Sequence, residues 1–224
     1  DYVVTKVARF PFDKFSDASN KLGTQMKATG EVMSIGRTME ESLLKAMRSL
    51  ETGVCHIYHK KFDDWTNDRL LEYIAEPTDD RLYAIAQLIR GGVDLVLIYN
   101  RTKIDMFFLE KFKNIVEFER VVEAAPMDIE VLREAKRMGF SDKFIGQLWG
   151  VSQHDMYLLR EKNGIFPVYK MIDTCASEFS SYVPYFYSTY EDENESLVSD
   201  KEKIVVLGSG PIRIGQGVEF DYST

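Results

Sequence analysis

The sequence predicts a mainly α-helical protein in which a helical domain is flanked by partial α/β pieces. Three observations support this fold class. From about residue 62 to residue 164, segments with a helical spacing of apolar residues follow one another, each bounded by a capping residue and a glycine or proline. Two segments typical of strands precede this region. A further strand-like segment, leading into a glycine-rich turn, follows it.

The N-terminal piece is predicted to contain two strands and a helix. Tyr2–Val7 is rich in β-branched residues and is followed by Pro11, and Gly30–Gly36 is a second short strand. Thr38 and Glu41 have the spacing of a capping box at the start of a helix. The apolar face of this helix is formed by Leu43, Leu44, Met47 and Leu50. This order is typical of the end of an α/β domain, so we expect the chain to be an internal piece of a longer protein.

The helical middle is predicted from its start and stop signals, which indicate six or seven short helices. Asp63 or Asp64 is expected to cap the first helix, and Asp79 or Asp80 the second, because aspartate accepts hydrogen bonds from the first backbone amides. The helices expected after these are Leu95–Tyr99, a long helix that starts at Thr102, Asp128–Met138, Ser141–Trp149 and Ser152–Lys162.

The C-terminal part of the chain is predicted to be extended. Val168–Ile172 and Tyr185–Tyr190 have the composition of strands, and the acidic run Glu191–Glu195 is interpreted as a solvated linker. Lys203–Leu207 is predicted to be a buried strand that opens a doubly wound α/β domain. A parallel strand needs cover on both faces, and the residues after Leu207 are too few to provide it.

Composition and charge disfavour several functional classes. The chain has 36 acidic and 28 basic residues, and the resulting net charge of −8 disfavours binding to nucleic acid. Its longest apolar runs are a few residues, far short of the roughly 20 that span a membrane. The two cysteines are too far apart in sequence to suggest a disulfide scaffold or a zinc site. These features predict a cytoplasmic protein.

The glycine-rich segment Gly208–Gly217 is the strongest local motif. Small residues after a strand allow close backbone approach, and helix amides can face an anion. The dinucleotide fingerprint requires a third glycine where this sequence has Arg213, and no P-loop lysine follows. A tight strand-to-helix turn is therefore favoured over a nucleotide site, which remains the alternative.

Residues 141–162 resemble a helix-turn-helix, with two short helices around a Gly-Val-Ser turn. Acidic and basic residues balance in this segment, and the start of its second helix offers only Gln153 and His154 to a DNA groove. Two helices that pack on a core are favoured, and a DNA-binding regulator remains the alternative.

Two smaller constellations are weaker signals. His56 and His59 lie near Cys55, but no second group of ligands supports a metal site, so a surface loop is favoured. Glu31 lies in an apolar strand, where its carboxylate must face solvent, a cation or a polar cavity. No catalytic residues can be assembled from the sequence.

Several segments taken together resemble the large subunit of carbamoyl-phosphate synthetase. The similarity spans the chain, and the motifs occur in the order of the family. They are Asp1–Lys6, Gln25–Lys27, Gly30–Thr38, Glu41–Leu43, Pro167–Lys170, Asp173–Ala176, Tyr187–Tyr190 and Leu207–Tyr222.

The resemblance implies a layout of three parts. Residues 1–51 correspond to the end of the first, carboxyphosphate-forming ATP-grasp half. Residues 52–195 correspond to a helical oligomerisation domain, and residues 196–224 to the start of the second, carbamoyl-phosphate-forming half. The departures Ala8 and Ile212 from some relatives touch no proposed site residue.

The resemblance also implies the activity of the whole enzyme, a ligase that makes carbamoyl phosphate from bicarbonate, glutamine-derived ammonia and two ATP for arginine and pyrimidine biosynthesis. ATP, magnesium or manganese and potassium would bind outside this chain, so we expect no cofactor and no catalysis here. The implied partners are a glutaminase small subunit and further copies of the chain, with no nucleic acid and no membrane. Three residues match positions that line the carbamate tunnel of the family: Glu31, Arg213 and Gly217.

Overall fold

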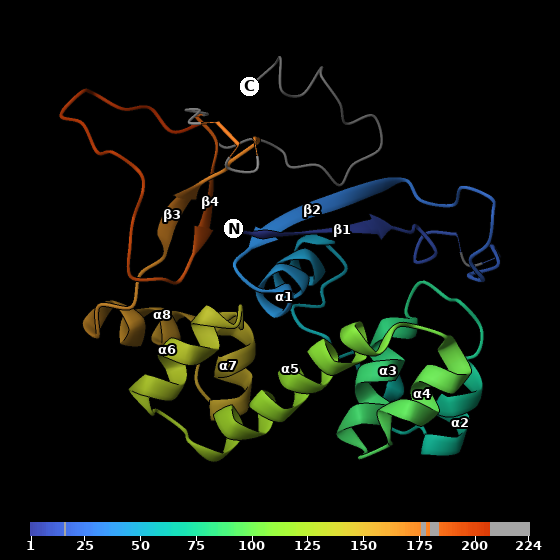
Figure 1. Cartoon of the computed structure of the whole chain (residues 1–224). Coiled ribbons are helices and arrows are strands. Elements are labelled where there is room, and N and C mark those ends of the chain that lie inside the picture. Colours follow the sequence, from blue (N-terminus) through green and yellow to red (C-terminus); the bar gives the residue numbers. More distant parts are fainter. Residues whose placement is uncertain (16, 176–177, 180–183, 207–224) are drawn as a thin grey trace.

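A computed structural model describes residues 1–15, 17–175, 178–179 and 184–206 of the chain. The long helix α5 (Met106–Ala124) joins two groups of shorter helices, as Figure 1 shows. A two-stranded sheet lies above the middle of this arrangement, with helix α1 (Met39–Ser49) between the sheet and the helices (Figure 1). The described residues are therefore mainly α-helical with small sheets, as predicted.

The N-terminal sheet consists of β1 (Val3–Arg9) and β2 (Gly30–Gly36), which pair antiparallel with Val3 opposite Gly36 and Arg9 opposite Gly30. Side chains alternate between its two faces. Thr5, Val32 and Ser34 are buried on the face toward α1. The opposite face is exposed at Val4, Lys6, Glu31 and Met33, and buried at Ile35. Both predicted strands and the helix that follows them are confirmed.

The first helical group contains the 3-10 helix η1 (Lys60–Phe62) and helices α2 (Asn67–Tyr73), α3 (Arg81–Arg90) and α4 (Leu95–Thr102). The prediction that Asp63 or Asp64 caps the first helix is wrong, because Thr66 is the N-cap of α2 and accepts a hydrogen bond from the amide of Arg69. Asp80 does occupy the N-cap position of α3, but its carboxylate makes no capping bond. It instead accepts hydrogen bonds from Lys61, Tyr73 and Thr78.

The long helix also begins later than predicted. Thr102 is the last residue of α4, and Lys103 follows it with a left-handed φ of 59° that ends the helix. Asp105 then caps α5 by accepting a hydrogen bond from the amide of Phe107. The prediction that Thr102 starts the long helix is therefore wrong. Thr102 ends α4, and a short turn separates it from α5.

The second helical group contains α6 (Ile129–Arg137), α7 (Asp142–Trp149) and α8 (Gln153–Lys162). Its predicted starts are confirmed, since the side chains of Asp128, Ser141 and Ser152 each accept an amide hydrogen bond at the N-cap. Gly150 ends α7 with a φ of 70°, a conformation that glycine adopts without steric cost.

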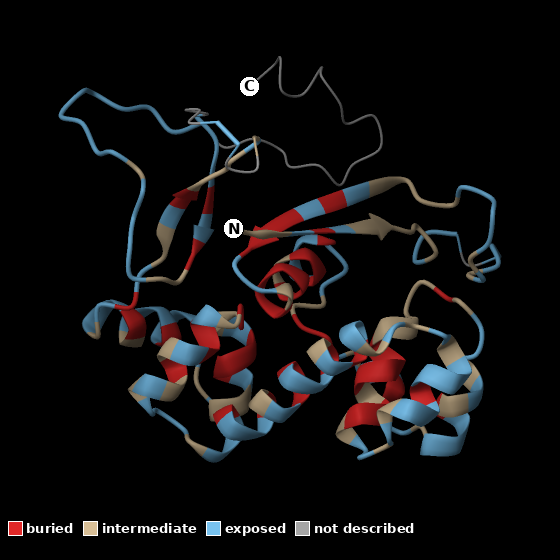
Figure 2. Cartoon of the chain, in the orientation of Figure 1, coloured by how far each residue is buried: buried red, intermediate tan, exposed pale blue. Residues whose placement is uncertain are grey.

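One hydrophobic core runs through both helical groups. Its members include the predicted apolar face of α1, of which Leu44 is fully buried, together with Ile85 of α3, Ile115 of α5 and Ile145 of α7. Figure 2 shows buried residues along the facing sides of α1, α3, α5 and α7, while α2 and α4 are largely exposed. The sheet, α1 and the helices are thus joined by shared apolar contacts.

The C-terminal part contains the two predicted extended segments, β3 (Val168–Met171) and β4 (Phe186–Thr189), and the structure pairs them in a second antiparallel sheet. The predicted buried strand Lys203–Leu207 is wrong for the residues that the structure describes. Residues 203–206 are irregular, and Ile204 and Val205 are 89% and 81% exposed. A strand is held by hydrogen bonds to a neighbouring strand, and none of the described strands pairs with this segment. Leu207 and the glycine-rich motif lie outside the described residues.

The helices of the described residues are too short or too polar to cross a membrane.

Candidate functional site

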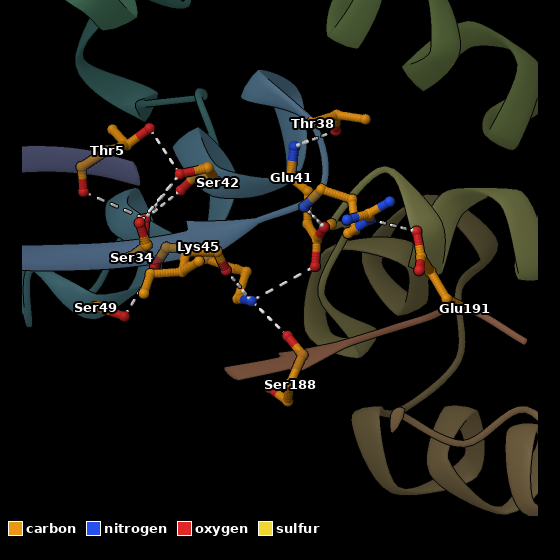
Figure 3. Close-up of polar contacts among 12 residues, drawn as sticks. Thr5, Ser34, Thr38, Glu41, Ser42, Lys45, Ser49, Ser188 and Glu191 are labelled. Atoms are coloured by element: carbon orange, nitrogen blue, oxygen red, sulfur yellow. Dashed lines mark hydrogen bonds and ion pairs between the residues drawn. The ribbon is translucent and has the colours of Figure 1, made fainter. Parts of the chain in front are cut away.

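The candidate site is the junction where α1 contacts both sheets. On the side of α1 that faces the first sheet, three buried hydroxyl groups connect the helix to β1 and β2 (Figure 3). Ser42 donates to Thr5 Oγ1 at 2.7 Å, and Ser34 donates to the backbone oxygen of Ser42 at 2.5 Å. These bonds satisfy polar groups that would otherwise be costly to bury, and they fix the rotation of α1 under the sheet.

The start of α1 is held by a variant of the predicted capping box. The amide of Glu41 donates to Thr38 Oγ1 at 3.1 Å, as predicted. The carboxylate of Glu41 accepts from the amide of Arg37 at 2.7 Å, one residue before the usual partner. Gly36 permits this approach, because a Cβ at that position would lie 2.9 Å from the carboxylate.

Lys45 connects α1 to the second sheet. Its ammonium donates to the backbone oxygens of Ile35 in β2 and Ser188 in β4, and it lies 3.5 Å from Glu41 (Figure 3). Burial lowers the pKa of Lys45, and the neighbouring Glu41 opposes this shift. Arg37 makes a second connection through its 2.9 Å ion pair with Glu191 (Figure 3).

The acidic run after β4 is irregular and mostly exposed, as the solvated linker suggested by the sequence would be, but it also makes ion pairs that the sequence did not suggest. Three of its glutamates surround the ammonium of the buried Lys170 at 3.4 to 3.9 Å, and Asp192 pairs with Arg137 of α6 at 2.9 Å. The amide of Met171 also donates to Glu195. These pairs connect the run to β3, to Arg37 before α1 and to α6, through cations that are distant in the sequence.

A cavity of about 850 Å³ lies between these parts of the chain. Its walls carry cations and carboxylates from α1, α5, α6 and the acidic run, and most of them neutralise each other. Lys111, for example, lies 3.4 Å from Glu40, and Asn114 donates to the same carboxylate at 2.8 Å. Because most of the cations are paired with carboxylates, the cavity has, among the described residues, no cluster of free cations that would bind an anion, and we interpret it as a junction between parts of the chain.

Of the three residues matched to tunnel positions, the structure describes Glu31 alone. It lies on the exposed face of β2, and its carboxylate is 2.7 Å from the ammonium of Lys6 in β1. The side chains of Val4 and Met33 are exposed on the same face. Arg213 and Gly217 lie outside the described residues, so the structure does not bring the three together.

A buried cluster that the sequence did not suggest lies within the helical domain. The prediction that His56 lies in a surface loop is wrong, since its side chain is 1% exposed and its ring stacks on Phe144 at 3.7 Å between centroids. Its Nε2 is 2.9 Å from Glu119 of α5, and Arg90 of α3 donates two hydrogen bonds of 2.7 Å to the same carboxylate.

The protonation of this cluster follows from its contacts. Burial lowers the pKa of His56, so the ring is neutral at pH 7. Burial alone would raise the pKa of Glu119, but Arg90 and His56 hold it below its usual value. An ionised carboxylate only accepts hydrogen bonds, so Nε2 of His56 is the donor. Its Nδ1 is buried and has no hydrogen-bond partner among the described residues.

A second buried cluster joins α6, α7 and α8. Asp142 accepts three hydrogen bonds from the guanidinium of Arg160, at 2.7 to 3.0 Å, and one from Lys136 at 2.8 Å. Burial lowers the pKa of Lys136 to about 8. Arg160 is thus directed into the interior, which removes one of the few cations that the helix-turn-helix segment could offer to DNA.

Comparison with protein-family models gives two matches. Residues 31–164, more than half of the chain, match the oligomerisation domain of the carbamoyl-phosphate synthetase large chain. Residues 200–224 match the preATP-grasp domain of carbamoyl phosphate synthase. The chain belongs to the carbamoyl-phosphate synthetase large-chain family. The resemblance noted in the sequence is thereby confirmed, and the family is one of ligases.

The matched residue ranges can be compared with the elements of the structure. The matched oligomerisation domain begins within β2 and extends to the end of α8, so it includes α1 and both buried charge clusters. The preATP-grasp match begins near the end of the described residues, after the acidic run. Helix α1 therefore lies near the start of the matched oligomerisation domain, and the acidic run lies between the two matched ranges.

Proposed function

We propose that this chain is the connecting and assembly segment of a glutamine-hydrolysing carbamoyl-phosphate synthetase large subunit. Residues 1–51 end the first ATP-grasp half, residues 52–195 form the oligomerisation domain, and residues 196–224 begin the second half. The order of the two family matches is the observation that carries this proposal, because an assembly domain followed along the chain by a preATP-grasp domain is a connecting arrangement.

In this proposal the reaction takes place in other parts of the subunit. They bind ATP, magnesium or manganese, and potassium, and they convert bicarbonate and ammonia from a glutaminase small subunit into carbamoyl phosphate for arginine and pyrimidine biosynthesis. The described residues connect the end of the first half to the oligomerisation domain through α1, Lys45 and the acidic run, and the second half follows in the chain. Since Arg160 is bound to Asp142, the alternative of a DNA-binding regulator gains no support.

Two measurements on this chain test the connecting role. We expect no ATP hydrolysis by residues 1–224, with or without bicarbonate, and we expect concentration-dependent self-association in sedimentation experiments. ATP turnover by the isolated chain would refute the non-catalytic role. A strict monomer, both in the isolated chain and in the full-length subunit, would refute the assembly role.

The tunnel assignment of Glu31, Arg213 and Gly217 is a separate part of the proposal. Glu31 supports it as an exposed carboxylate on a sheet face that also exposes the apolar side chains of Val4 and Met33. In the full-length enzyme, Gly217→Phe should obstruct passage and lower carbamoyl-phosphate yield while bicarbonate-dependent ATP hydrolysis continues. Gly217→Ala, which adds one methyl group, is the matched control. A normal yield from Gly217→Phe would exclude the tunnel role.

A further inference from the structure

Helix α4 has more apolar residues than the described protein buries. It contains Leu, Val, Leu, Ile and Tyr in succession, yet Ile98 is its one buried residue. Val96 is 57% exposed and Leu97 is 42% exposed. An amphipathic helix on a monomer surface turns its polar face outward. On α4, apolar side chains face outward as well, which is the pattern of a surface that another molecule covers.

The exposed residues of α4 form a strip along the helix. Leu95, Ile98 and Thr102 face the protein, and the helical period places Val96, Leu97, Asn100 and Arg101 on the opposite side. Figure 2 shows this outward side of α4 as exposed. A straight strip of this kind is the shape that packs against another helix.

A hollow lies beside the strip. It has a volume of about 370 Å³ and lies between the start of α4, the end of α3 and the side of α5. Its lining combines apolar side chains, among them Ile89, Val96 and Val116, with the charged side chains of Asp94, Lys113, Glu117 and Arg120. A side chain from a helix packed on the strip can enter this hollow, so the surface offers a groove as well as a ridge.

The charges at the ends of the strip are complementary to each other. Asp94 stands at the first end as the N-cap, and Arg101 and Lys103 stand at the other. Arg101 has no ion-pair partner within the described part of the chain. If a second α4 lies antiparallel on the first, each Asp94 comes beside the basic end of the other helix. Such a contact is self-complementary, as a two-fold interface requires.

We propose that α4 is the surface through which two copies of this chain pair, antiparallel about a two-fold axis close to Leu97. The inference rests on the proposed assembly function and adds the contact that carries it. Val96 and Leu97 of the strip supply apolar area for the contact, the hollow receives a partner side chain, and the paired charges set the antiparallel direction. The match to an oligomerisation domain includes the whole of α4.

The first test compares two substitutions in the full-length large subunit by sedimentation velocity. Leu97→Glu places a carboxylate at the centre of the proposed contact and should raise the dimer dissociation constant by at least about 30-fold, the effect of losing one central contact. Leu158→Glu in α8 is the matched control, since Leu158 is 45% exposed, and it should leave the constant unchanged.

The outcomes separate the two proposals. A wild-type dimer that Leu97→Glu leaves intact overturns the α4 contact, while the assembly function stands. A wild-type protein that is monomeric at all concentrations overturns both. Equal dissociation by Leu97→Glu and Leu158→Glu also overturns the α4 contact, because a specific surface would distinguish them.

The second test uses the symmetry of the contact. In a background with Cys55→Ser and Cys175→Ser, Leu97→Cys places one thiol of each copy near the axis, so mild oxidation should yield a reducible dimer in high yield. Leu158→Cys in the same background should remain monomeric on denaturing gels. If the thiol introduced by Leu97→Cys neither cross-links nor reacts with a maleimide, another part of the same chain covers α4, and the inference is wrong.

Discussion

At the scale of single residues, each buried charge cluster places one carboxylate between two donors. Glu119 lies between Arg90 and His56, and Asp142 lies between Lys136 and Arg160. Removing one partner of such a group leaves an uncompensated buried charge, which is costly. The clusters therefore fix which helices contact each other. The unpartnered Nδ1 of His56 shows that this arrangement is kept even at the cost of one unsatisfied polar atom.

The buried His56 predicts a pH dependence of stability. Its pKa is lowered in the folded protein, so below about pH 6.5 the unfolded chain takes up a proton that the folded chain does not. The free energy of unfolding should therefore fall as pH decreases from 7.5 to 5.5, with a slope of at most about 1.4 kcal/mol per pH unit. Glu119 does not add to this slope. Its pKa is lowered in the folded protein, so its protonation changes the free energy of unfolding only below about pH 4.5.

Urea unfolding at several pH values measures this slope. His56→Gln should flatten it, whereas His154→Gln, at an exposed position on α8, should leave it as in the wild type. Equal slopes in the wild type and in His56→Gln would contradict the neutral state assigned to the buried ring.

At the scale of helices and strands, local signals set most of the boundaries. The second helical group begins where its capping residues predict, since Asp128, Ser141 and Ser152 each satisfy free amides of the first turn. In the first group, several acidic and hydroxyl residues compete for the same role. In that group, tertiary contacts decide which side chain caps a helix. The carboxylate of Asp80 accepts hydrogen bonds from Lys61 and Tyr73 instead of from the first amides of α3.

The cap of α2 can be tested directly. Thr66→Ala removes the hydroxyl that accepts from Arg69, and it should lower the free energy of unfolding by about 1 kcal/mol. Asp64→Ala, at the exposed position that the sequence also offered as a cap, should change it by less than about 0.5 kcal/mol. Chemical denaturation of both variants distinguishes the two, and a larger loss in Asp64→Ala would reverse the assignment.

At the scale of the whole molecule, the two sheets are connected through α1. The hydroxyl groups of Thr5, Ser34 and Ser42 hold the first sheet, and the ammonium of Lys45 holds the second (Figure 3). The acidic run adds its own contacts to Arg37 and α6. The connection between the two sheets thus depends on a few polar contacts, and two of them, Lys45 with Ser188 and Arg37 with Glu191, join residues more than 100 positions apart in sequence.

Replacing Lys45 should loosen the second sheet without unfolding the helices. Lys45→Met keeps a chain of similar length but removes the donor to Ile35 and Ser188, so local opening of β4 should become easier by about 1.5 to 3 kcal/mol. Hydrogen exchange followed by mass spectrometry should show faster exchange in residues 186–189 and no change in α3. Lys60→Met, at an exposed position of η1, serves as the control. Unchanged exchange in β4 would mean that Lys45 does not hold it.

The sequence by itself determined most of the helices, the segments that form strands, and the family. Periodicity and capping are local properties, and the ordered motifs from Gly30–Thr38 to Tyr187–Tyr190 need no coordinates to be recognised. It also singled out Glu31, whose exposure on a sheet face agrees with the interpretation that it faces solvent or a cation. Its match to a tunnel position stays a prediction.

The tertiary structure alone decided where the charges lie. His56 and Glu119 are 63 residues apart, and no periodic pattern links a loop histidine to a glutamate in the middle of a helix. The same holds for Lys170 and the acidic run, and for the exposed strip of α4, whose apolar sequence resembles that of a buried helix. Burial and ion pairing depend on which segments meet in space, and for these residues that is fixed by the packing of the whole chain.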